Sequence, residues 1–194
     1  MQYPLKMTFS LFTLSQQISV TDASGQMVLY VKQKLFRFKE RIEVFADAGM
    51  TQKRFEINAD RMIDFSANYH FTDAQGNPWG AVRREGMRSL WSAQYDIYDE
   101  DGIEMSIREE EPWKRLLEGV LGEIPIVGFL VIYWLNPTYQ VLQRDGSVAM
   151  RVVKKPSVFE RYFEIEKRAE MDPDDELRAL LALIMMVLLE KSRG

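Results

Sequence analysis

The stretch that decides the fold is "DPDDELRALLALIMMVLLEKSRG", residues 172–194. Asp172 is a favourable N-cap, and Pro173 suits the first position of a helix. The three acidic residues that follow favour the positive end of the helix dipole. The pattern therefore predicts a helix over residues 173–191.

This helix would be apolar on every side. Arg178 and Glu190 bracket an uninterrupted apolar run, residues 179–189. Eleven helical residues span about 16 Å, whereas the hydrocarbon core of a bilayer is about 30 Å thick. A helix that is apolar all round and too short to cross a membrane should be surrounded by protein. We therefore expect it to form the core; the alternative is a peripheral membrane anchor.

Composition limits the functional classes. The net charge of −4 argues against general nucleic-acid binding, which needs a dominant basic face. The absence of cysteine excludes disulfides and thiolate metal sites. The stretch "MQYPLKMTFSLFTLSQQ", residues 1–17, lacks the compact apolar region of a signal peptide, so we expect a cytoplasmic protein.

The residue pattern in the middle of the chain predicts β-strands. The segments "MVLYVKQKLFRF" (27–38), "RIEVFAD" (41–47) and "AQYDIYDEDGIEMSIREE" (93–110) alternate apolar and polar residues, as half-buried strands do. Short turns containing glycine separate about a dozen such segments.

The turns also show a repeat, in which a turn glycine is followed six residues later by a valine and then by basic residues. The three clear copies are Gly25 to Val31, Gly76 to Val82 and Gly146 to Val152. Repeated hairpins favour a closed sheet, because closure removes exposed strand edges. The sequence predicts a mainly β fold: one domain over 1–194, a closed antiparallel barrel of about twelve strands around the C-terminal helix.

The stretch "LYVKQKLFRFKERIEVFADAG" (29–49), the D-x-x-G hairpins and the apolar final helix resemble the LURP-one-related family. These proteins are relatives of the phospholipid scramblases within the tubby C-terminal-like superfamily. The resemblance covers residues 5–108 and 137–190 and is best over Tyr30–Phe45. It implies a tubby-like barrel of about twelve strands with the last helix threaded through it.

Residues 109–138 depart from this pattern as an insert. Its first part has the spacing of an amphipathic helix, and a wholly apolar run, residues 126–135, follows. We consider three alternatives for the segment 112–135: it packs on its own barrel, forms an oligomer or partner interface, or touches lipid. Glu118 and Glu123 disfavour a membrane span. The candidate apolar patch consists of Trp113, Val127, Phe129, Leu130, Tyr133 and Trp134.

Basic residues at the repeat positions, together with Arg37 and Lys39, which the turn after Lys34 could bring nearby, are the candidates for binding a phosphate or lipid head group. They are Lys32, Lys34, Arg37, Lys39, Arg83, Arg84, Lys154 and Lys155. We expect several of them to gather on one flank of the barrel; the alternative is an ordinary solvated outer face. Tubby-like relatives use such a patch for phosphoinositide head groups, so the resemblance implies the same use here.

No catalytic, metal-binding or cofactor motif is recognisable. We interpret His70, the single histidine, as structural, and residues 96–104 as a hairpin turn, not a calcium loop. We therefore expect a non-enzymatic barrel, without cofactor or metal, that binds an anionic lipid or phosphorylated ligand and is peripheral at a membrane surface. A structural or protein-interaction module, such as a homo-oligomer, is the alternative. Scramblase-like activity ranks below both, and nucleic acid is not an expected partner.

Overall fold

The computed structural model describes residues 1–10, 15–34, 41–60, 67–85, 94–110, 138–155 and 161–191. Over these ranges the chain forms twelve strands and one helix: β1 (Leu5–Ser10), β2 (Ser15–Thr21), β3 (Met27–Lys34), β4 (Arg41–Phe45), β5 (Lys53–Ala59), β6 (Asn68–Asp73), β7 (Pro78–Arg84), β8 (Gln94–Asp99), β9 (Gly102–Glu109), β10 (Thr138–Gln143), β11 (Val148–Lys155), β12 (Arg161–Lys167) and α3 (Pro173–Lys191).

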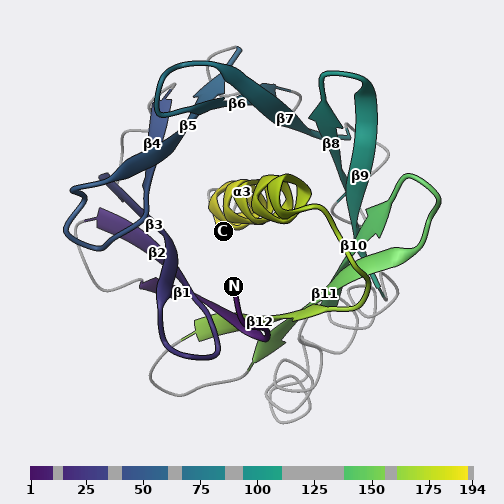
Figure 1. Cartoon of the computed structure of the whole chain (residues 1–194), viewed down its shortest axis with the longest axis horizontal. Coiled ribbons are helices and arrows are strands. Elements are labelled where there is room, and N and C mark those ends of the chain that lie inside the picture. The colour runs from purple at the N-terminus through teal and green to yellow at the C-terminus, as the bar shows by residue number, and fades with distance from the viewer. Residues whose placement is uncertain are drawn as a thin grey trace, which may run out of the picture.

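The strands close into a barrel. Each strand pairs antiparallel with its neighbours in sequence, and β1 completes the ring by pairing with β12, with Leu5 opposite Ile165. Figure 1 looks into the ring and shows α3 inside it. Closure leaves none of the twelve strands with an unpaired edge. The predicted closed antiparallel barrel is confirmed.

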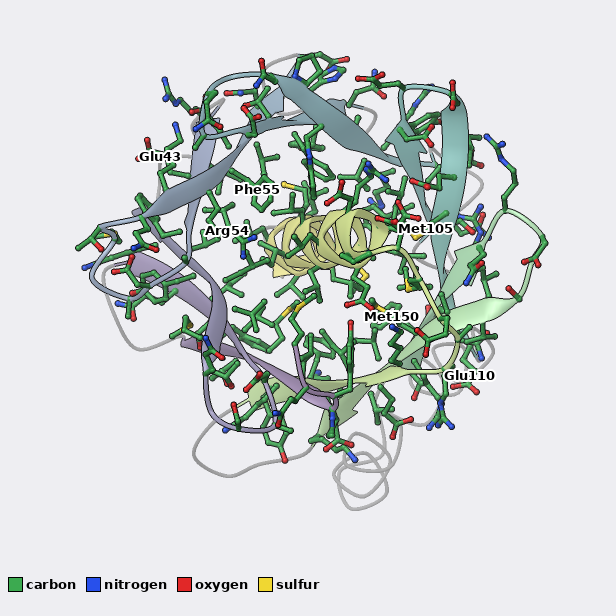
Figure 2. All side chains as sticks on the ribbon, in the orientation of Figure 1. Glu43, Arg54, Phe55, Met105, Glu110 and Met150 are labelled. Atoms are coloured by element: carbon green, nitrogen blue, oxygen red, sulfur yellow. The ribbon has the colours of Figure 1, made fainter. Side chains whose placement is uncertain are left out.

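The alternation of residue types along a strand decides which side chains face the helix. In β4, Ile42 and Val44 are buried, whereas Arg41 and Glu43 are exposed. Figure 2 shows the same division across the barrel, because Met150 lies between the wall and α3 and Glu43 lies outside. Period-two alternation therefore builds an apolar lining and a polar outer face from the same strands.

The barrel interior is filled by α3. Every side chain from Ala179 to Leu189 is at most 4% exposed. The helix is thus a core element, as expected, and the strands already cover the apolar surface that a membrane anchor would need. Among the residues that the structure describes, no helix is both long enough and apolar enough to span a bilayer.

The start of α3 follows its sequence signals. The Asp172 carboxylate accepts a hydrogen bond from the backbone N–H of Asp174 at 2.9 Å, and the Asp172 carbonyl accepts one from Glu176 at 3.0 Å. Asp172 is therefore the N-cap that the sequence predicts.

The two ends of the barrel differ in their connections. Short turns join β2 to β3, β4 to β5, β6 to β7, β8 to β9 and β10 to β11 at one end, which we call the hairpin end. The chain passes from β12 into α3 at this end as well. At the opposite end, which we call the far end, β3, β7, β9 and β11 finish.

The turns of the three repeat copies share one geometry. An aspartate carboxylate accepts the backbone N–H two residues ahead: Asp22 from Ser24, Asp73 from Gln75 and Asp145 from Ser147. Each aspartate has a lowered pKa, because side-chain hydrogen bonds from Ser24, Asn77 and Ser147, respectively, and then these backbone hydrogen bonds favour the carboxylate form. The glycines of all three turns have positive φ, between 82° and 90°, which explains why glycine recurs there.

Candidate ligand-binding surface

The repeat found in the sequence corresponds to a spacing around the barrel. Val31, Val82 and Val152 point inward from β3, β7 and β11, and each is at most 1% exposed. In the closed strand order these three strands are separated by equal steps of four strands. The three copies therefore lie about a third of the circumference apart.

This spacing overturns one expectation about the basic residues. They do not gather on one flank, because β3, β7 and β11 lie on different sides of the ring. They share an end of the barrel instead: Lys34, Arg84 and Lys155 are the last residues of their strands, all at the far end. A sequence repeat conserves the position along a strand, whereas strand order decides the position around the ring.

Two of the candidate cations face solvent. Lys32 on β3 and Arg83 on β7 are both exposed. Neither side chain forms a hydrogen bond or ion pair with any of the residues that the structure describes. The charge of Lys32 is thus available to an external anion, whereas the charge of Arg83 also acts on the nearby Glu85 carboxylate.

Arg84, by contrast, is not a surface cation. It is 4% exposed, and its guanidinium lies 5.9 Å from the centroid of the Tyr95 ring. Successive side chains of a strand point to opposite faces, so Arg83 and Arg84 cannot both point outward. Placing Arg84 in an external patch was therefore wrong.

The pair on β11 is engaged within the barrel wall. Lys155 forms an ion pair with Glu164 at 2.8 Å, and the hydrogen bond to Glu164 raises the pKa of Lys155. Lys154 lies opposite Phe163 in the β11–β12 ladder and is half-buried. An external anion would have to compete with Glu164 for Lys155.

The remaining candidates are not placed by the structure. Lys34 ends β3, and its side chain lies outside the described residues, as do the whole of Arg37 and Lys39. The same holds for the apolar candidates Trp113, Val127, Phe129, Leu130, Tyr133 and Trp134, and for the predicted insert helix. The insert is bounded by Glu109, which ends β9, and Thr138, which begins β10. Both boundary residues lie at the far end, together with the ends of β3, β7 and β11.

The hairpin end carries acidic residues. Five turns there each contain an aspartate that accepts backbone N–H groups: Asp22, Asp47, Asp73, Asp99 and Asp145. The first turn of α3, at the same end, adds Asp174, Asp175 and Glu176. An anionic surface would repel this end of the barrel.

The outer wall also has a hollow of about 440 Å³ over β6, β7 and β8. Its lining includes His70, Ala81, Arg83, Tyr98, Asp99 and Glu100. We call it the β6–β8 hollow. It contains the exposed cation Arg83 and so is the described surface that best combines a candidate residue with a concave shape.

The position of His70 differs from its interpretation in the sequence. His70 is exposed on the outer face of β6 and lines the β6–β8 hollow. Its ring makes no hydrogen bond with the part of the chain that the structure describes. Within the described residues, His70 is thus an exposed histidine whose ring is not held by a hydrogen bond.

Sequence reasoning did not find the β6–β8 hollow. Strand alternation could have placed His70 and Arg83 on the outer face. The register that sets Ala81 between His70 and Tyr98 comes only from strand pairing. A short side chain between two rings is visible as a hollow only in the folded sheet.

Comparison with known proteins supports one family. A model of the LURP-one-related family matches residues 27–178, from the start of β3 to the second turn of α3. No curated protein and no solved structure gives a significant match. The family match covers well over half of the 194 residues, and so this chain belongs to the LURP-one-related family.

Proposed function

We propose that this LURP-one-related barrel is a non-enzymatic protein that binds an anionic lipid or phosphorylated ligand at a membrane surface, through the far end of the barrel. The proposal rests on one observation, which is that several candidate features lie at the same end of the barrel. The basic repeat positions of β3, β7 and β11 and both boundaries of the apolar insert all lie there.

Two weak contributions to membrane binding would then act at the same end of the barrel. Cations near an anionic leaflet contribute about 1 kcal/mol each, and apolar side chains add the free energy of leaving water. Neither contribution alone anchors a protein firmly, but together they support reversible peripheral binding. The exposed Lys32 and Arg83 would supply part of the first contribution.

The distribution of acids supports this orientation. The turn aspartates and the first turn of α3 lie at the hairpin end, away from the proposed contact. With a net charge of −4, the protein as a whole is repelled by an anionic surface unless its charges are segregated. Docking by the far end places these turn aspartates and the start of α3 on the side remote from the membrane, whereas Glu85, Glu109 and Glu110 stay at the contact end.

Vesicle sedimentation tests the proposal. Wild-type protein should pellet with phosphatidylcholine vesicles that contain phosphatidylserine or a phosphoinositide, and the bound fraction should fall sharply from 0.1 to 0.5 M salt. The Debye length decreases from about 10 Å to about 4–5 Å over that range. The double variant Lys32→Gln/Arg83→Gln should lose most of the binding.

The matched control is Arg144→Gln/Arg168→Gln, which removes the same charge from exposed positions at the hairpin end. It should bind as the wild type does. Equal losses in the two double variants would mean that only net charge matters and would refute a far-end contact.

The insert provides a second test. Leu130→Lys should weaken vesicle binding if residues 112–135 touch lipid. A wild-type dimer that does not bind vesicles and that Leu130→Lys converts to a folded monomer would favour the oligomer interface instead. Sedimentation velocity distinguishes these outcomes.

A further inference from the structure

The β6–β8 hollow has a defined floor and two aromatic walls. In the strand ladder His70 lies opposite Ala81, and Ala81 lies opposite Tyr98. Neighbouring strands are about 4.8 Å apart, so the backbones that carry His70 and Tyr98 are separated by about 9–10 Å. The methyl group of Ala81 leaves room between them for one compact group.

Charged residues stand at the two ends of the hollow. Arg83 is two residues beyond Ala81 on β7, on the same face and toward the far end. Asp99 and Glu100 follow Tyr98 toward the hairpin end, where β8 turns into β9. The hollow therefore has a cation toward the far end and carboxylates toward the hairpin end, and the cation Arg83 also interacts with Glu85 just beyond β7.

Several of these groups are available to a ligand. Among the described residues, the side chains of His70, Arg83 and Glu100 have no hydrogen-bond or ion-pair partner. One oxygen of Asp99 accepts the backbone N–H of Asp101 at 2.8 Å, and the charge of Asp99 also acts on Glu104. By contrast, the neighbouring Asn68 amide already donates to Asp60 at 2.8 Å.

The geometry points to a binding site for a small phosphate ester that also carries an amine or quaternary ammonium, the chemistry shared by phosphocholine and phosphoethanolamine. Arg83 and the His70 ring bind the phosphate oxygens, because a guanidinium donates charge-assisted hydrogen bonds to phosphate. The cationic group lies over Ala81 against the face of Tyr98 and toward the carboxylates of Asp99 and Glu100.

The acids explain why a plain anion is the poorer ligand. Inorganic phosphate or a polyanionic head group bound by Arg83 and His70 lacks the cationic group that offsets Asp99 and Glu100, so the repulsion from these carboxylates weakens its binding. A zwitterion satisfies both ends of the hollow at once. Arg83 takes part in both proposals, but Tyr98, Asp99 and Glu100 belong to the hollow alone, so this inference does not depend on the proposed docking of the far end.

Isothermal titration calorimetry with full-length protein tests the inference, with phosphocholine, phosphoethanolamine, inorganic phosphate and choline as separate probes. At least one of the two zwitterions should bind at least tenfold more tightly than phosphate or choline. Arg83→Gln should weaken phosphocholine binding at least tenfold, and Tyr98→Leu should do the same by removing the aromatic face.

The decisive variant is Glu100→Gln. It should weaken phosphocholine binding but leave phosphate binding unchanged or stronger, since it removes a negative charge from one end of the hollow. The control Arg144→Gln, an exposed change outside the hollow, should leave both unchanged. Because these are surface positions, melting temperatures should confirm that each variant is folded.

Vesicle sedimentation distinguishes the two possible sources of the ester, a lipid head group and a free metabolite. Sedimentation with pure phosphatidylcholine or phosphatidylethanolamine vesicles identifies a lipid head group, whereas binding of the soluble esters alone identifies a free metabolite; either supports the shared chemistry. Equal affinity for phosphate and both zwitterions, or phosphocholine binding that survives both Arg83→Gln and Tyr98→Leu, would overturn the inference. Since Glu100→Gln should not reduce binding to anionic vesicles, failure here is distinguishable from failure of the proposed function.

Discussion

The Nε of Arg178 in α3 donates a hydrogen bond to the backbone carbonyl of Trp79 in β7, over a distance of 3.0 Å. The Nη1 of the same guanidinium lies 2.6 Å from both Glu104 of β9 and Asp175 of α3. Arg178 interrupts the apolar pattern of the helix in sequence, and in the fold it joins the helix to two strands at the hairpin end. It fixes the depth and rotation of α3 within a largely apolar interior.

We predict that Arg178→Met destabilises the protein by about 2–3 kcal/mol at pH 8, because Glu104 and Asp175 lose the cation between them. At pH 5 the cost should be smaller, since one carboxylate can bind a proton instead. Urea unfolding at both pH values measures the difference. As a control, Arg168→Met removes an exposed partner of Glu166 and should cost less than about 1 kcal/mol.

Gly80 in β7 lies beside the Arg178 side chain, where α3 contacts the barrel wall. Its φ is +126°, and a Cβ there would lie 2.5 Å from the Tyr98 carbonyl and 2.9 Å from the Arg178 side chain. Gly80→Ala should therefore lower stability by more than the roughly 1–2 kcal/mol expected for a left-handed residue alone. Gly76→Ala is the matched control, because its φ is also positive but a Cβ there meets nothing. Equal losses of melting temperature would show that the contacts around Gly80 can relax.

Stability should depend on pH through Glu104. Burial and the hydrogen bond with Asp175 raise the pKa of Glu104 to about 7, against the opposing effect of Arg178. Between its ordinary pKa, near 4.5, and pH 7, the folded state binds more protons than the unfolded state, so stability falls as pH rises. Urea midpoints measured from pH 4.5 to 8 should decline in the wild type and decline less in Glu104→Gln.

Protonation of Glu85 also contributes to the pH dependence of stability, so the same experiment needs a Glu85 variant as a control. Its hydrogen bond with Asp96 raises the pKa of Glu85, which acts in the same direction. Glu85→Gln should therefore remove a separate part of the slope. A profile for Glu104→Gln that matches the wild type would refute the assignment to Glu104.

The interior position of α3 predicts the effect of a charge there. Met185 is 0% exposed, and Met185→Asp would bury an unpaired carboxylate among apolar side chains. We expect this variant to be largely unfolded by circular dichroism and to aggregate. Met185→Leu, which nearly conserves volume, should cost less than about 1.5 kcal/mol. A folded Met185→Asp protein would contradict the core role of the helix.

The sequence alone was sufficient for the architecture. Period-two alternation, repeated D-x-x-G turns and an apolar run with an N-cap are local patterns, and each reports on the burial of its own segment. Ile42 and Val44 can only face inward if Arg41 and Glu43 face out. A helix apolar on all sides, residues 179–189, requires a closed shell around it, and the family resemblance supplied the same barrel.

Only the tertiary structure shows where the candidate binding residues lie relative to one another. The repeat predicted equivalent basic positions, but closure of twelve strands placed them a third of a turn apart, and alternation turned Arg84 inward beside Tyr95. The neighbours His70, Ala81 and Tyr98 come from three strands whose register depends on pairing across the sheet. A sequence pattern indicates the face of the strand on which a side chain lies. The neighbours of that side chain depend on hydrogen bonding between strands that are distant along the chain.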